Sequence, residues 1–159
     1  MRDKRSIQRE IEALGLPPIV SQIFQGTTSR PELSYRCENP HKSLADGSGF
    51  PKHFLPLWEC GTSVTAFDLA DRMFCKIDLE SPGAPHFRVK GFDGVVADVL
   101  IDLWEDEVGD DVLSDLAAQF GFSRLPSLLS ALERGSTSDY ETWRDALRTN
   151  SSEQGGTGP

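Results

Sequence analysis

Seven acidic residues lie between positions 98 and 111, and their spacing makes them the strongest candidates for a functional site. Paired carboxylates can bind Mg²⁺, but a working site also needs a pocket and a substrate phosphate. The same residues can instead form an anionic surface that binds a basic protein, or one that only confers solubility. We take them as candidate partner-binding residues: Asp98, Asp102, Glu105, Asp106, Glu107, Asp110 and Asp111.

A thiol and an imidazole lie four residues apart at Cys37 and His41, as in half of a zinc site. A second ligand pair would be needed, and Cys60 and Cys75 have no neighbouring ligand. A Cys–His nucleophile would need a third group to orient the base, and the sequence shows none. We expect no metal and no cofactor.

Sequence motifs of hydrolases and nucleotide-binding enzymes are missing. The sequence contains no GxSxG, HExxH, P-loop or GxGxxG pattern. Gly91-Phe92-Asp93-Gly94 resembles a glycine-rich turn only by composition, and a strand-to-helix turn with Asp93 as N-cap explains it better. We expect no catalytic residues and a non-enzymatic protein.

The charge of the chain disfavours nucleic acid as a direct partner. The 159 residues carry a net charge of −9, and residues 53–159 hold eight Lys/Arg against nineteen Asp/Glu. A nucleic-acid binder needs the opposite sign to neutralise phosphates. A basic protein partner is favoured instead, while the oligomeric state is left open.

The composition predicts a protein of the cytoplasm. No apolar run approaches the roughly 18 residues that span a bilayer. The charged N-terminus is not followed by the apolar region of a secretory signal. The three cysteines form no CxxC pair, which favours reduced thiols over a disulfide framework.

The hydrophobic periodicity predicts an α+β fold, with a small antiparallel sheet of about four strands packed against helices. We expect a single domain over residues 1–148, with an irregular loop at 25–52 containing at most a short strand near Leu33–Cys37, and a disordered tail at 149–159. Strands are predicted near 53–58, 62–67, 73–79 and 86–89. Helices are predicted near 7–14, 93–105, 110–120, 123–133 and 139–149, with possible helical turns at 19–24 and a Ser138–Glu141 capping box.

The acidic residues fall on the helix predicted to follow Asp93. Asp98, Asp102 and Glu105 lie opposite its aliphatic stripe, so we expect them to point to solvent. The i, i+4 spacing of Asp98 and Asp102 costs about 0.2–0.5 kcal/mol by repulsion. The acids at residues 105–107 oppose the dipole at the end of that helix. Such local inconsistencies are often functional.

The segment from Leu55 to Leu132 resembles the SUKH superfamily, which includes fungal cell-wall regulators of the Smi/Knr type and bacterial toxin-immunity proteins. Leu14-Gly15-Leu16-Pro17 is similar to the start of family members. Four further segments carry the likeness: Leu55-Pro56-Leu57-Trp58, Thr65-Ala66-Phe67-Asp68, the stretch from Phe92 to Asp106, and Leu116-Ala117-Ala118-Gln119-Phe120-Gly121-Phe122.

The resemblance implies an immunity protein that binds and neutralises a partner toxin, often a nuclease. A basic toxin domain would complement the acidic residues. Two alternatives stay open: a regulatory scaffold for cell-wall or signalling enzymes, as in the fungal relatives, and a small metal-dependent hydrolase. The family shares no catalytic residues, so the resemblance assigns none here.

Overall fold

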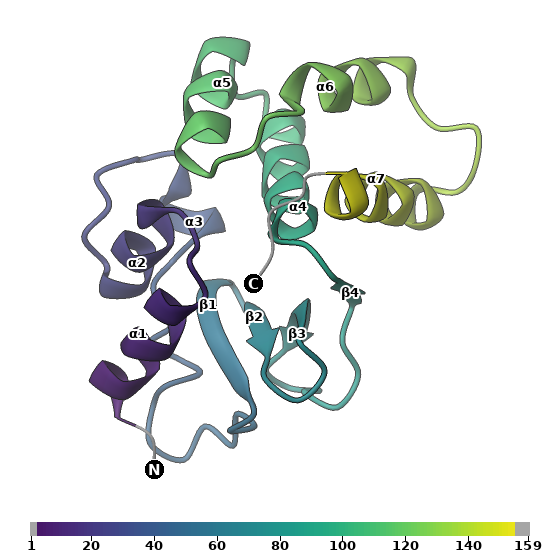
Figure 1. Cartoon of the computed structure of the whole chain (residues 1–159). Coiled ribbons are helices and arrows are strands. Elements are labelled where there is room, and N and C mark those ends of the chain that lie inside the picture. The colour runs from purple at the N-terminus through teal and green to yellow at the C-terminus, as the bar shows by residue number, and fades with distance from the viewer. Residues whose placement is uncertain (1–2, 155–159) are drawn as a thin grey trace. The chain divides into compact units, whose positions relative to one another are not determined.

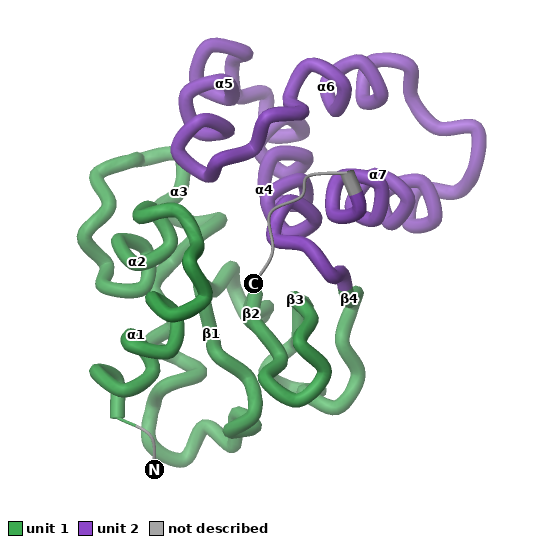
Figure 2. The backbone as a smooth tube through the Cα atoms, in the orientation of Figure 1, with its two compact units in different colours: residues 1–88, 159 green, residues 89–158 purple. Residues whose placement is uncertain are grey.

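The computed structural model describes residues 3–154, and within them the chain forms two compact units (Figure 2). The range predicted as a single domain, residues 1–148, spans both. Unit 1 comprises residues 3–88 and holds the first three helices and most of the sheet. Unit 2 comprises residues 89–154 and is built from four helices.

The sheet has four strands, as predicted, in the order β1-β2-β3-β4. Its hairpin pairs are antiparallel, with Val64 opposite Ile77 and Ala66 opposite Cys75. Because side chains alternate along a strand, these residues share one face, where they form a buried cluster with Phe54. The strands are β1 (Phe54–Cys60), β2 (Ser63–Asp68), β3 (Met73–Asp78) and β4 (Phe87–Val89).

Pro56 lies on the edge strand β1, where an imino acid without an N–H is tolerated. The register between β1 and β2 shifts between Pro56 and Trp58. Such a bulge bends the strand and re-aims the side chains beyond it. It precedes Glu59, a fully buried carboxylate.

Three helices of unit 1 contact β1: α1 (Lys4–Ala13), α2 (Pro18–Gln25) and α3 (Leu33–Arg36) (Figure 1). The strand predicted near Leu33–Cys37 is wrong, because residues 33–36 form one helical turn. Leu33 and Cys37 are both buried, and four residues is the spacing that places two side chains on one helix face. Apart from Gln25, which ends α2, and an isolated antiparallel bridge between Glu38 and Glu59, the rest of the 25–52 segment has turns and bends.

Unit 2 contains the four helices predicted after residue 92. Gly121 has a φ of 67° and ends the second of them in the left-handed region, as its position predicted. No helix within residues 3–154 combines the length and apolarity of a membrane span. The helices are α4 (Phe92–Glu105), α5 (Asp110–Gln119), α6 (Leu125–Arg134) and α7 (Tyr140–Gln154).

Two predicted helix caps are wrong. Gly91, not Asp93, is the N-cap of α4, and Asp93 lies inside the first turn. At the start of α7, Asp139 accepts hydrogen bonds from the Thr142 backbone N–H at 3.0 Å and from its hydroxyl at 2.7 Å. Asp139 thus has the capping role that the predicted box gave to Ser138. The hydrogen bonds to Thr142 lower the pKa of Asp139.

The predicted tail is shorter than expected, because α7 continues to Gln154. Residues 149–154 of that tail are therefore helical, and residues 155–159 lie outside the described part of the chain. The polar composition after Thr149 pointed to disorder, but Ser151 and Ser152 are buried. Contact with α4 outweighs their weak helix propensity.

Glycines let α7 approach α4 closely. A Cβ on Gly91 would lie 2.5 Å from the Ser152 carbonyl oxygen, and one on Gly94 would lie 3.0 Å from Ser152 Cβ. The Gly91 backbone N–H also donates to the Ser152 hydroxyl. The glycines of the 91–94 turn therefore admit the last turn of α7 against the start of α4.

Candidate functional site

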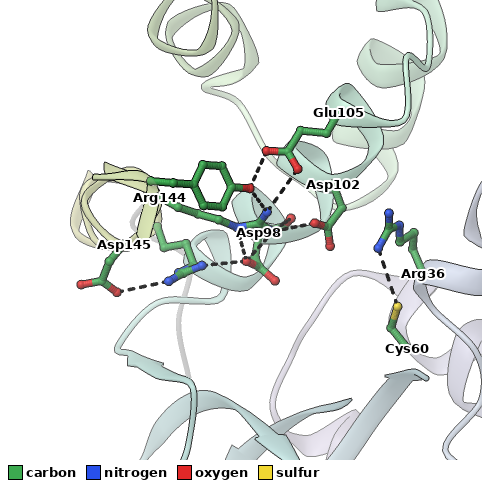
Figure 3. Close-up of polar contacts among 9 residues, drawn as sticks. Arg36, Cys60, Asp98, Asp102, Glu105, Arg144 and Asp145 are labelled. Carbon is green, nitrogen blue, oxygen red and sulfur yellow. Dashed lines mark hydrogen bonds and ion pairs between the residues drawn. The ribbon is translucent and has the colours of Figure 1, made fainter. Parts of the chain in front are cut away.

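Two arginines of α7 converge on one carboxylate of α4. Arg144 donates to Asp98 Oδ1 from Nε at 3.1 Å and from Nη2 at 2.9 Å (Figure 3). Arg148 Nη1 donates to the same oxygen at 3.0 Å. Arg144 Nη2 also donates to the Asp98 backbone carbonyl at 3.0 Å. Asp98 is therefore the centre of an ion-pair network between α4 and α7.

The network extends one turn along α4. Arg144 Nη2 lies 2.7 Å from Asp102 Oδ1, and its Nη1 donates to the Tyr140 hydroxyl at 2.8 Å. The Tyr140 hydroxyl in turn donates to Glu105 Oε1. We call Asp98, Asp102, Arg144 and Arg148 the ion-pair network, and Glu105 lies at its edge.

The expectation that Asp98 and Asp102 point to solvent is wrong. The exposed fraction of the Asp98 side chain is 5%, and that of Asp102 is 15%. Burial opposes the charge of Arg144, but attraction to the two carboxylates outweighs it and raises the guanidinium pKa. The arginines also remove the repulsion between Asp98 and Asp102, because each carboxylate faces a cation.

The remaining candidate residues lie at the surface, where α4 ends and α5 begins. Glu107 has a φ of 62°, a left-handed conformation that glycine or asparagine adopts more readily. Asp110 and Asp111 occupy the first turn of α5, where the helix dipole favours them. We call this surface the acidic turn, and it consists of Glu105, Asp106, Glu107, Asp110 and Asp111, all exposed.

The excess negative charge of the chain belongs entirely to one region. Residues 1–88 carry eleven Lys/Arg and eleven Asp/Glu, whereas residues 89–159 carry five and fourteen. Two of those five cations, Arg144 and Arg148, are held inside by the ion-pair network. Asp98 and Asp102 are held there with them, so the network is neutral as a whole and the negative excess of unit 2 lies on its other residues.

Asp93 is a second buried carboxyl of unit 2. Its residue exposure is 1%, and its Oδ1 has no hydrogen-bond partner in the structure. Burial raises the pKa of Asp93 to about 6, and the nearby charge of Arg124 limits the rise. Sequence reasoning missed this residue because an acid after Gly91 looks like a helix cap.

Unit 1 also contains a buried carboxylate, Glu59, but this one accepts hydrogen bonds from backbone amides and a hydroxyl. Glu59 Oε1 accepts from the Ser43 backbone N–H at 2.7 Å and from the Ser43 hydroxyl at 2.8 Å. Its other oxygen lies 3.3 Å from the Lys42 backbone N–H and 3.8 Å from His41 Nδ1. Glu59 thus ties the predicted irregular loop to β1.

The tied loop borders a cavity of about 210 Å³ in unit 1. Leu44, Phe50 and Pro51 of the loop line it together with Ile7 and Phe54. The lining is mostly apolar, and its shape depends on the loop that Glu59 fixes. No group of catalytic side chains converges on it among the residues that line it.

The structure separates the residues of the hypothetical zinc site. Cys37 is buried, whereas the His41 side chain is exposed and its Nδ1 lies 3.0 Å from the Asn39 carbonyl oxygen. Within residues 3–154, no cluster of three or more His, Cys, Asp or Glu could hold a metal ion. Cys75 is fully buried, which raises its pKa to about 12 and keeps it a neutral thiol.

Sequence reasoning missed the arginine half of the ion-pair network. Arg144 and Arg148 are spaced i, i+4, the same spacing as Asp98 and Asp102. This complementary spacing on two helices was a usable signal, because equal spacing lets two helix faces match charge for charge. The choice of partner helix, however, depends on tertiary packing.

Comparison of the chain with protein-family models, curated proteins and solved structures finds no match.

Proposed function

We propose that this protein is a non-enzymatic binding domain that acts in the cytoplasm and neutralises a partner toxin, with the acidic turn as its docking surface. The partner is a basic protein domain, such as a cationic nuclease. Asp98 and Asp102 have no direct part in docking, because the ion-pair network holds them inside unit 2.

The observation that carries this proposal is an exposed acidic turn that concentrates five carboxylates where α4 ends and α5 begins. Glu105 lies in the last turn of α4, where the helix dipole disfavours an anion. Glu107 holds a left-handed backbone that costs a non-glycine residue about 1 kcal/mol. Strained and repelling residues on a surface are typical of binding sites.

Electrostatics gives the acidic turn a means of selecting its partner. The cations of the ion-pair network are balanced by Asp98 and Asp102, so they do not offset the charge of the acidic turn. A concentrated negative surface raises the association rate of a cationic protein by 10- to 1,000-fold and repels anions. Nucleic acid is therefore disfavoured as a direct ligand.

The resemblance to the SUKH superfamily supports the immunity role over general acidity. The fungal relatives provide the alternative function, a regulatory scaffold for cell-wall or signalling enzymes. A scaffold would bind several partners weakly, whereas an immunity protein would bind one partner tightly. The number of specific partners therefore separates the two functions.

The test has two steps: to establish whether the adjacent gene encodes a toxin, and then whether the toxin domain of that product co-purifies with this chain. The full chain would be compared with the double variant Glu107→Lys/Asp111→Lys, which reverses two exposed charges of unit 2. The matched control, Asp46→Lys/Glu80→Lys, reverses two exposed acids of unit 1. Both variants change the net charge equally, so general charge effects cancel.

We expect the wild-type chain and the control variant to retain the toxin and protect cells from it. The double variant of unit 2 should lose at least tenfold in affinity. Equal retention by both variants would remove the acidic turn from the proposal. Retention of several unrelated enzymes instead of the toxin would favour the scaffold function.

A further inference from the structure

A groove between α6 and α7 has the opposite chemistry to the acidic turn. It encloses about 190 Å³ within unit 2. Leu128 and Ala131 of α6 and Leu147 of α7 form its apolar part. Arg124 and Arg134 also line it, at the two ends of α6. The groove thus combines a small apolar patch with polar side chains, and an arginine lies at each end of α6.

One face of α6 builds this lining. The α6 residues in the lining recur at positions 124, 127, 128, 131 and 134, the three- and four-residue spacing of a helix face. The ends of that face are separated by roughly 15 Å along the helix axis, at 1.5 Å per residue. Arginine side chains are long and flexible, so both guanidinium groups can turn toward a ligand between them.

Two of the four arginines in residues 89–154 line this groove. Arg144 and Arg148 instead face Asp98. Of the arginines in residues 89–154, the other two are Arg124 and Arg134, and both line the groove. Ser127 and Asn150 add a hydroxyl and an amide to the same lining.

We propose that the groove binds a small organic anion, a carboxylate or phosphate carried on an apolar body. The guanidinium groups supply charge-assisted hydrogen bonds to the anionic group. The leucine and alanine side chains cover the apolar body. A cavity of about 150 Å³ holds a benzene ring, so about 190 Å³ has room for a ring with one anionic substituent.

This inference goes beyond the proposed function, because it needs neither the acidic turn nor a protein partner. In a unit with a large negative excess, long-range electrostatics repels an anion. Binding must then depend on the two arginines of the groove, which makes it sensitive to their removal. A ligand that binds for its apolar surface alone would not show that sensitivity.

The probes are benzoate and phenyl phosphate, with benzamide as the neutral probe of similar shape. Amide chemical shifts of the full ¹⁵N-labelled chain would be followed by NMR during each titration. We expect benzoate and phenyl phosphate to bind with dissociation constants on the order of 1 mM, typical of efficient ligands of this size. The shifts should concentrate on α6 and α7.

The variants are Arg124→Gln and Arg134→Gln, with Arg9→Gln as the control for an exposed arginine of unit 1. Each groove variant should weaken benzoate binding about tenfold, the effect of losing a charge-assisted hydrogen bond. The control should leave binding unchanged, and benzamide should bind at least tenfold more weakly than benzoate.

Three results would overturn the proposal. Equal affinity for benzoate and benzamide would exclude recognition of the charge. Unchanged benzoate binding in both groove variants would exclude the arginines. Absence of shifts in α6 and α7 up to about 20 mM of either anionic probe would exclude the groove, since that limit corresponds to negligible affinity.

Discussion

The two units of this chain each bury a carboxylate, and they satisfy it with different groups. In unit 1, Glu59 receives neutral donors from Lys42 and Ser43 and fixes a loop. In unit 2, Asp98 receives two guanidinium groups and fixes the last helix. Unit 1 has balanced charges, whereas unit 2 holds the full negative excess.

This difference shows how an acidic unit can keep a strongly anionic surface and still fold. Two buried arginines neutralise the carboxylates that would otherwise repel each other inside unit 2. The acids that remain outside, in the acidic turn, lie where solvent screens them. The interior charges therefore provide stability, and the exposed charges are available for binding.

The largest effect is expected from Asp98→Ala. The substitution leaves Arg144 and Arg148 buried without their shared carboxylate, and removal of one partner of a buried pair costs about 3–5 kcal/mol. Urea unfolding measures the loss. The control is Asp145→Ala, which removes a mostly exposed partner of Arg148 and should cost less than about 1 kcal/mol. Equal losses in the two variants would contradict the central place of Asp98.

A second prediction contrasts Asp98 with Asp93, a buried carboxyl of unit 2 whose Oδ1 accepts no hydrogen bond. The folded-state pKa of Asp93 is about 6, above the ordinary value of 3.8, so the folded protein holds this proton more tightly. Below about pH 4, Asp93 is protonated in both the folded and the unfolded protein and does not lower the free energy of unfolding. As the pH rises toward 6, Asp93 ionises in the unfolded protein but not in the folded protein. The free energy of unfolding therefore falls by about 2–3 kcal/mol in all.

Asp93→Asn tests this sign, because an amide does not titrate. The stability of the variant relative to wild type should rise by about 2–3 kcal/mol between pH 4 and pH 7. Urea midpoints at four pH values give this difference, and groups common to both proteins cancel. A difference that stays constant with pH would show that the buried carboxyl does not titrate in this range.

Glu59→Gln should have a smaller effect than Asp98→Ala. The amide keeps one acceptor oxygen but loses charge-assisted bonds to the loop, a change of about 1–2 kcal/mol. Hydrogen exchange at the Ser43 amide should accelerate before global unfolding, because the loop opens locally. A loss of 3 kcal/mol or more would erase the contrast between the two units.

Most of the fold was predictable because the local patterns agree with the tertiary structure. The alternation in residues 73–79 predicted β3, and Gly121 marked the end of α5. The predictions were wrong in two segments where tertiary packing outweighs the local preference of the residues. Leu33 and Cys37 bury one side of a helical turn in a segment that looked extended, and the last turn of α7 is buried against α4 despite its serines.

The candidate site was predictable only in its exposed half. Acids near a helix end are visible in the sequence, so the exposure of the acidic turn could be predicted, and its role in binding stays a prediction. The burial of Asp98 was not, because its aliphatic neighbours placed it on the outer face of α4 as an isolated helix. The partner that covers that face, α7, begins about forty residues later, and hydrophobic periodicity does not specify such long-range pairings.

The central claim is that exposed acids of unit 2 attract a cationic partner, and the association rate tests it most directly. Stopped-flow mixing of the purified toxin domain with wild type and with Glu107→Lys/Asp111→Lys would be run at low and high salt. We predict a rate at least tenfold slower for the variant at low salt, with the two rates converging as salt screens the charges. Equal rates at low salt would contradict the claim.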